Sequence, residues 1–179
     1  QLDLDFIEEI KKKSGQPVQL CYQCQKCAAG CPISSFSDFH SNQIIRLLQY
    51  GLKETVLNSQ AIWLCSGCET CGARCPNGIS VGRVMDALRE MAVAEGVAGK
   101  GGRILLFHRE FLNSVRASGR VNETMLLARY KIKSGQLFSD LKLGLAMFRK
   151  GKLALFPAGI RRKGEVQRIF HQAERGKQL

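Results

Sequence analysis

The segment CYQCQKCAAGCP, residues 21–32, occurs a second time as CSGCETCGARCP, residues 65–76. In each copy three cysteines are spaced two residues apart, a fourth follows after three more residues, and a proline comes directly after the fourth. The copies start 44 residues apart and contain all 8 cysteines of the 179-residue chain. No other part of the sequence repeats as clearly, so we expect these two segments to determine the fold and the chemistry.

The eight cysteines are expected to bind an inorganic cofactor rather than to form disulfides or zinc sites. Residues 1–13 mix acidic and basic side chains and lack the apolar core of a secretory signal, so we expect a cytoplasmic location, where disulfides are rare. Structural zinc sites usually take their cysteines as two separated pairs. Three cysteines at such short intervals instead suit three corners of an iron–sulfur cube.

The spacing resembles that of bacterial two-cluster ferredoxins, in which the fourth cysteine of each run binds the other [4Fe–4S] cluster. The resemblance implies two [4Fe–4S] clusters with exchanged fourth ligands. Cys21, Cys24, Cys27 and Cys75 would hold the first cluster, and Cys31, Cys65, Cys68 and Cys71 the second. Small residues between the ligands would let backbone N–H groups approach the sulfur atoms. These residues are Ala28, Ala29, Gly30, Gly67, Gly72 and Ala73.

Apolar residues at helical spacing lie between and after the cysteine motifs, and no alternating strand pattern is present, so the fold is predicted to be all-α. The expected helices cover residues 41–49, 53–58, 81–92, 104–115, 125–132, 141–148 and 166–173. Ser41, Ser80 and Asn122 are expected as N-caps, because their side chains can accept hydrogen bonds from the first turn. The segment 152–157 is short and ends in proline, so it is not expected to be helical.

The charge distribution divides the chain into two parts. Residues 1–99 contain 9 Lys and Arg against 10 Asp and Glu, whereas residues 100–179 contain 18 against 5, and the formal net charge is +12. We expect a cluster-binding domain at 1–99 and a basic helical extension for partner docking at 100–179. The glycine-rich segment 99–102 lacks the spacing of a phosphate loop and is interpreted as a linker. No apolar run is long enough to span a membrane.

The helical patterns between the motifs resemble the α-helical ferredoxin domain in iron–sulfur subunits of fumarate reductases and succinate dehydrogenases. The chain is more similar still to the C-subunit of heterodisulfide reductase. Besides both cysteine runs, the residues that carry this resemblance are Arg46–Leu52, Ala61–Cys65, Val84–Arg89, Phe107–Phe111, Gly119–Val121 and Gly151–Leu153.

The resemblance implies a non-catalytic electron-relay role. In that family the C-subunit carries electrons from a flavin-containing A-subunit to a cysteine-rich catalytic B-subunit, which reduces a disulfide. The further cysteine-rich motifs of the B-subunit are missing from this sequence. The alternative within the same class is an iron–sulfur subunit of another flavin-dependent dehydrogenase or reductase.

A nucleic-acid-binding module is the alternative of another class, since the basic half could follow phosphates. Few aromatic residues and the mixing of basic residues with apolar stripes argue against it, so no nucleic-acid partner is expected. The histidines His40, His108 and His171 pair with no cysteine at metal-ligand spacing and are interpreted as core or surface residues. Trp63 is interpreted as core packing, with shielding of a cluster as the alternative.

Overall fold

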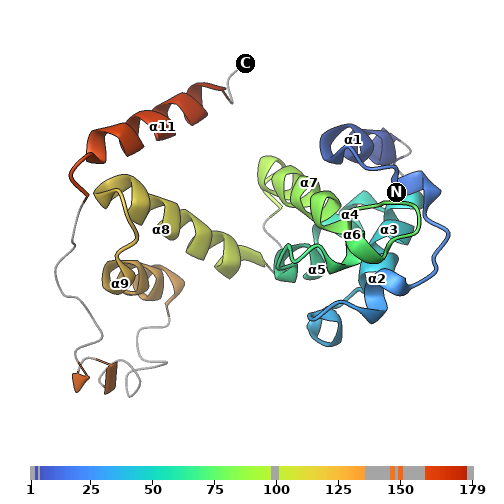
Figure 1. The fold of residues 1–179 in the computed structure, drawn as a ribbon, viewed down its shortest axis with the longest axis horizontal. Helices are drawn as coiled ribbons and strands as arrows, with labels where there is room; N and C mark the ends of the chain where they lie inside the picture. Colours follow the sequence, from blue (N-terminus) through green and yellow to red (C-terminus); the bar gives the residue numbers. More distant parts are fainter. Residues whose placement is uncertain are drawn as a thin grey trace. The chain divides into compact units, whose positions relative to one another are not determined.

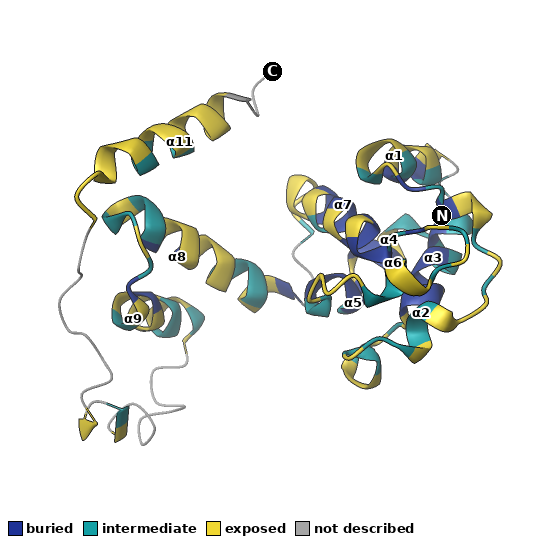
Figure 2. Ribbon diagram, in the orientation of Figure 1, coloured by how far each residue is buried: buried dark blue, intermediate teal, exposed yellow. Residues whose placement is uncertain are grey.

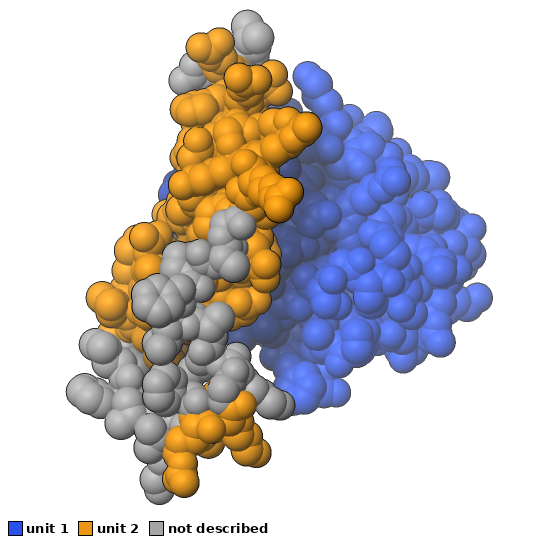
Figure 3. Space-filling model, turned by 60° about the vertical axis from the view of Figure 1, so that its left-hand side comes forward, with its two compact units in different colours: residues 1–102 blue, residues 103–179 orange. Residues whose placement is uncertain are grey.

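The computed structural model describes residues 3, 5–97, 101–135, 146–147, 149–150 and 160–176. Within these ranges the regular structure is helical and contains no strand, which confirms the predicted all-α class (Figure 1). The chain divides into two compact units, residues 1–102 and 103–179 (Figure 3). The roles that we expect for the two parts of the chain remain predictions.

Unit 1 is built around one long helix, α7. Its elements are α1 (Asp5–Ser14), η1 (Val18–Leu20), α2 (Lys26–Ala29), η2 (Ser34–Phe36), α3 (Ser41–Gln49), α4 (Lys53–Leu57), α5 (Ala61–Leu64), α6 (Thr70–Arg74) and α7 (Val81–Ala94). Helix α7 contacts α1, α4, α5 and α6. Its residues Val84 and Leu88 are fully buried, and the buried positions of this unit gather along α7 and α3 (Figure 2).

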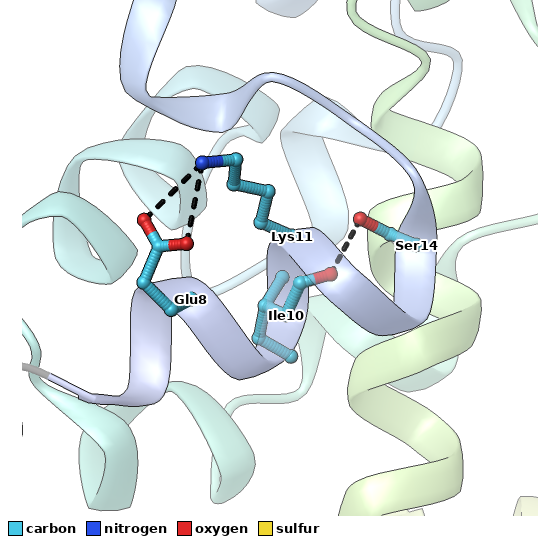
Figure 4. A network of polar contacts seen from close by, with 4 residues as sticks. All are labelled: Glu8, Ile10, Lys11 and Ser14. Atoms are coloured by element: carbon cyan, nitrogen blue, oxygen red, sulfur yellow. Dashed lines mark hydrogen bonds and ion pairs between the residues drawn. The ribbon is translucent and has the colours of Figure 1, made fainter.

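Helix α1 was not predicted from the sequence, although its spacing carries the signal. Phe6 and Ile10, four residues apart, are both buried, and the Asp3 carboxylate accepts hydrogen bonds from the first turn. At the other end, the Ser14 hydroxyl donates to the Ile10 carbonyl at 2.7 Å. Lys11 and Glu8 form an ion pair on the same helix (Figure 4). The mixed charge of residues 1–13 masked this short amphipathic stripe.

Two N-caps follow the prediction and one does not. The Ser80 side chain accepts from the Arg83 N–H at the start of α7, and Asn122 accepts from the Met125 N–H at the start of α9 (Glu123–Ser134). For α3 the prediction was wrong by one residue, because His40 is the N-cap and Ser41 is the first helical residue. The His40 N–H donates to the Gln43 side chain at 2.8 Å, which stabilises this earlier start.

Unit 2 contains most of α8 (Gly102–Ser118), together with α9 and α11 (Lys163–Gly176). The carboxylate of Glu110 is buried and pairs with Lys133 at 2.5 Å, which joins α8 to α9. Arg116 pairs with Glu174 at 2.5 Å, which joins α8 to α11. The expected helices at 104–115, 125–132 and 166–173 lie inside α8, α9 and α11.

The structure corrects the predicted linker in one respect. Helix α8 already begins at Gly102, within the glycine-rich segment, while residues 99 and 100 lie outside the described residues. The expected helix at 141–148 also lies outside them apart from residues 146 and 147, and the segment 152–157 lies wholly outside them. Among the described residues, no helix combines the length and the apolar character needed to cross a bilayer.

Candidate iron–sulfur site

The repeat in the sequence is also a repeat in backbone conformation. In the first motif Gln23 and Gln25 have left-handed φ values of +64° and +62°, and the equivalent residues of the second motif, Gly67 and Glu69, have +66° and +57°. A short helix follows each loop, α2 in the first motif and α6 in the second. Alternating left-handed residues turn successive backbone N–H groups inward, a geometry that favours negatively charged ligands.

The first of two cavities beside these loops is lined by three cysteines of the first motif and one of the second. Its cysteines are Cys21, Cys24, Cys27 and Cys75, and its other lining residues are Gln23, Gln25, Asn42, Ile45, Ile79 and Val81. The cavity has a volume of about 340 Å³, counting its open mouth. The structure therefore brings the four cysteines of the first predicted ligand set to one cavity, and their ligand role stays a prediction.

The second cavity has the reciprocal composition. Cys65, Cys68 and Cys71 come from the second motif and Cys31 from the first, in a cavity of about 520 Å³ counting its mouth. His40 and Glu69 also line this cavity. His40, which was interpreted from the sequence as a core or surface residue, thus lies beside this cavity, with its Nδ1 atom 2.7 Å from the Ser34 hydroxyl. Val81 lines both cavities and so lies between them.

The local geometry explains why the fourth cysteine of each motif separates from the other three. Helices α2 and α6 contact one another, and the Arg74 side chain packs over Gly30. The Cys31 N–H donates to the Ala28 carbonyl at 3.1 Å, and the equivalent bond of the second motif closes the same turn at 3.2 Å. Cys75 then has extended backbone angles, as expected before a proline. Each fourth cysteine therefore emerges beyond its own loop, beside the neighbouring cavity.

The eight thiols suit a polynuclear cluster better than a single metal ion. All are free of disulfides. Within the described ranges, no three or more His, Cys, Asp or Glu side chains gather tightly enough to hold one metal ion. A zinc ion draws four sulfur atoms to about 2.3 Å from one centre. In a [4Fe–4S] cluster each thiolate binds a different iron, so the sulfur atoms surround a wider space than those of a zinc site.

The thiols differ in how readily they release protons. Burial raises the pKa of Cys27 to about 11, and burial also raises the pKa of Cys65. Hydrogen bonding from Thr70 lowers the pKa of Cys68, whose sulfur lies 3.5 Å from the Thr70 hydroxyl. Metal ligation needs the thiolate, so cluster assembly must displace protons from half-buried thiols such as Cys27 and Cys65. This proton release makes assembly pH-dependent.

Polar side chains that were not predicted as site residues hold the two loops in place. The Gln49 amide on α3 donates to the carbonyls of Val18 and Cys21, at 3.1 and 3.0 Å. On the other side, Arg89 of α7 donates to the Cys65 carbonyl at 3.4 Å. The sequence signal that could have identified these two residues is an amide or a cation on a helix face that is otherwise mostly apolar. Trp63 is buried and packs against Gly101 without lining either cavity, which supports the core-packing interpretation.

Comparison with known proteins agrees with this geometry. Residues 17–79 match a family described as a 4Fe–4S dicluster domain. The chain is 33% identical over 112 residues to the iron–sulfur C-subunit of the CoB–CoM heterodisulfide reductase of Methanopyrus kandleri, an alignment covering 58% of each chain. It is 36% identical over 94 residues to the C-subunit of a ferredoxin:CoB-CoM heterodisulfide reductase of Methanosarcina acetivorans, covering 50% of this chain and 38% of the relative.

A third relative is the C-subunit of the H(2):CoB-CoM heterodisulfide,ferredoxin reductase of Methanothermobacter thermautotrophicus. It is 33% identical over 61 residues, which cover 34% of this chain and 33% of the relative. The chain thus spans between one third and three fifths of the length of these curated relatives. The resemblance predicted from the sequence is confirmed: residues 17–79 match the 4Fe–4S dicluster domain, and the chain is similar to the iron–sulfur C-subunit of heterodisulfide reductases.

Proposed function

We propose that this protein is the electron-transfer subunit of a larger oxidoreductase complex, in which it relays electrons through two [4Fe–4S] clusters. Cys21, Cys24, Cys27 and Cys75 hold one cluster, and Cys31, Cys65, Cys68 and Cys71 hold the other. Each cluster, when bound, takes up and releases one electron without bond chemistry on a substrate. The observation that carries the proposal is the division of the eight thiols into two cavities of four.

The partners belong to the proposal as well. A flavoprotein similar to the A-subunit of heterodisulfide reductase would deliver electrons, and a cysteine-rich catalytic protein similar to the B-subunit would accept them to reduce a disulfide. Support comes from relatives whose names describe them as the C-subunit of such reductases. Unit 2 supports a docking role, because several of its large apolar side chains are exposed and basic residues such as Arg109, Arg116 and Arg129 alternate with them in the sequence. The exposed apolar residues are Phe107, Phe111, Leu112, Met125, Leu127, Ile132, Ile160 and Ile169.

Two measurements test the proposal. Anaerobically purified protein should contain about eight iron and eight acid-labile sulfide per chain. Purification of the native complex, followed by identification of its components, should yield a flavoprotein and a second iron–sulfur protein. Zinc in place of iron, or about four iron in fully loaded protein, would refute the two-cluster assignment. A native complex without a flavoprotein would refute the proposed electron donor.

A further inference from the structure

Gln23 lies in the first cysteine loop with an unusual backbone conformation. Its φ of +64° is in the left-handed region, which is sterically unfavourable for residues other than glycine. The second loop has Gly67 at the equivalent position, with φ +66°. The fold therefore accepts glycine here, and the first loop carries a glutamine despite the strain. Such an outlier suggests that the side chain has a task.

The side chain of Gln23 connects a ligand sulfur to helix α3. Its Nε2 atom donates to the Cys21 Sγ atom at 3.4 Å. Its Oε1 atom accepts from the Asn42 Nδ2 atom at 3.1 Å. Asn42 is only 9% exposed and lines the same cavity as Cys21. Three groups from two segments thus form one chain of hydrogen bonds that ends on a cluster ligand.

The chemistry of a ligand thiolate fixes the direction of this chain. A metal-bound thiolate can accept a hydrogen bond but has no proton to donate, so the amide group of Gln23 must point its NH₂ toward Cys21. The carbonyl of Gln23 then faces away from the sulfur and needs a donor. Asn42 supplies that donor from a buried position, so it holds the amide in the orientation that serves the sulfur.

We propose that Gln23 raises the reduction potential of the cluster at Cys21, Cys24, Cys27 and Cys75, with Asn42 as the positioning residue. The inference rests on the ligand assignment of the proposed function. Reduction adds negative charge to the cluster and its thiolates, so an N–H donor on a ligand sulfur stabilises the reduced form more than the oxidised form.

The two loops differ in a way that separates the two potentials. Gly67 provides no side-chain donor to Cys65. Thr70 offers a hydroxyl to Cys68, but at 3.5 Å and at an exposed sulfur. Glu69 lines the second cavity and adds a carboxylate there. The first site therefore has an amide donor at a position where the second has none, and the second has a nearby anion. The cluster at the first site is expected to be reduced first in a titration.

The test is a redox titration of the full-length chain, anaerobically purified with its clusters and followed by EPR. Gln23→Gly removes the donor, and glycine adopts the same left-handed backbone without strain, so the loop should keep its shape while the first midpoint potential falls. A neutral hydrogen bond is worth roughly a fivefold change in an equilibrium constant, which corresponds to about 40 mV for one electron. The second midpoint potential should not move. Gln23→Met, which keeps the chain length without the donor, should produce the same fall.

Gln25→Gly is the matched control, because Gln25 has φ +62° and lines the same cavity, and no hydrogen bond from its side chain to a sulfur is present in the described part of the chain. It removes a side chain from the same cavity without removing a donor to a sulfur, so the first potential should fall clearly less than in Gln23→Gly. Asn42→Leu should lower the first potential in the native background but have little further effect in the Gln23→Gly background, because Asn42 acts through Gln23.

The outcomes separate the inference from the function on which it rests. If the unsubstituted chain binds no [4Fe–4S] cluster, the proposed function fails. If both clusters are present and Gln23→Gly and Gln23→Met leave the first potential unmoved, the inference alone is wrong. An equal fall in Gln25→Gly would assign the effect to the loop backbone. Additive effects of Asn42→Leu and Gln23→Gly would remove Asn42 from the positioning role.

Discussion

The exchange of fourth ligands can be tested by removing Cys75 and Cys31 one at a time. If ligation were local, Cys75 would serve the cluster of Cys65, Cys68 and Cys71, its neighbours in sequence. If the ligands are exchanged, Cys75→Ala should damage the cluster of Cys21, Cys24 and Cys27, because Cys75 lines that cavity. Cys31→Ala should damage the other cluster, because Cys31 lines the second cavity.

The expected loss follows from the number of thiols in each cavity. Cys75→Ala leaves three thiols in the first cavity and all four in the second. Three ligands support a three-iron form at best, so iron should fall from about eight per chain to about seven, or to about four if the cluster is lost. The backbone of Cys75 is extended at φ −78° and ψ 119°, which alanine adopts without strain, so local misfolding is not expected to cause the loss.

The assay is EPR of each variant, combined with iron and sulfide analysis. The two substitutions are matched controls for one another, because they remove the same side chain from equivalent positions of the repeat. Each variant should lose one [4Fe–4S] signal, with a three-iron signal where three irons are retained, and the surviving [4Fe–4S] signal should be a different one in each. If Cys75→Ala spares the first cluster and damages the second, ligation is local and the α-helical ferredoxin assignment is wrong in its central feature.

Three further predictions concern charge and surface. Glu69→Gln should raise the potential of the second cluster by roughly 40 mV, taking about 1 kcal/mol for a nearby charge; a redox titration in which only the first cluster moves would contradict this. Leu112→Ser on α8, where that side chain is 52% exposed, should weaken binding of the partner complex and leave iron content unchanged, whereas Val93→Ser in unit 1 should do neither. Glu110→Gln should lower the free energy of unfolding at neutral pH by roughly 1 kcal/mol, because the Glu110 carboxylate is buried while Lys133 is half-exposed. The hydrogen bond from Lys133 holds the pKa of Glu110 below its ordinary 4.5. The difference in stability should therefore persist as the pH falls to 4.5 and disappear as acid protonates Glu110 in the folded chain. Thermal unfolding of both proteins across this pH range would show it.

The sequence predicted those features that depend on strict residue spacing. The cysteine repeat indicated the two groups of four thiols through the ferredoxin resemblance, and the apolar spacing from Val81 onward indicated the central helix, which the structure extends to Ala94. Both signals are strong because a cluster ligand position or a buried helix face accepts few alternative residue types. The stretch at residues 5–14 was missed because only Phe6 and Ile10 of that helix are buried, too few for a clear periodic pattern among charged residues.

The polar framework of the site could not be predicted in the same way. Gln16 accepts a hydrogen bond from the Ser80 N–H at 2.7 Å, across 64 residues of sequence. Asp38 accepts from the N–H groups of Gln60 and Ala61, which fixes the start of α5. These contacts depend on how separate segments pack, and a lone Gln or Asp in a loop has no spacing that distinguishes it from a solvated one.

One buried residue connects the folding core with the proposed relay. Val81 is the first residue of α7, is only 4% exposed and lines both cavities. Its neighbour Ser80 accepts at the helix N-terminus and also donates to the Glu69 carboxylate at 2.7 Å, so the start of α7 is tied to the second cysteine loop. The wall between the two sites is therefore part of the central helix of unit 1 and not of either loop. Because close-packed cores change shape little, the separation of the two proposed clusters is set by the same packing that stabilises the fold, while their potentials are adjusted by loop side chains such as Gln23 and Glu69.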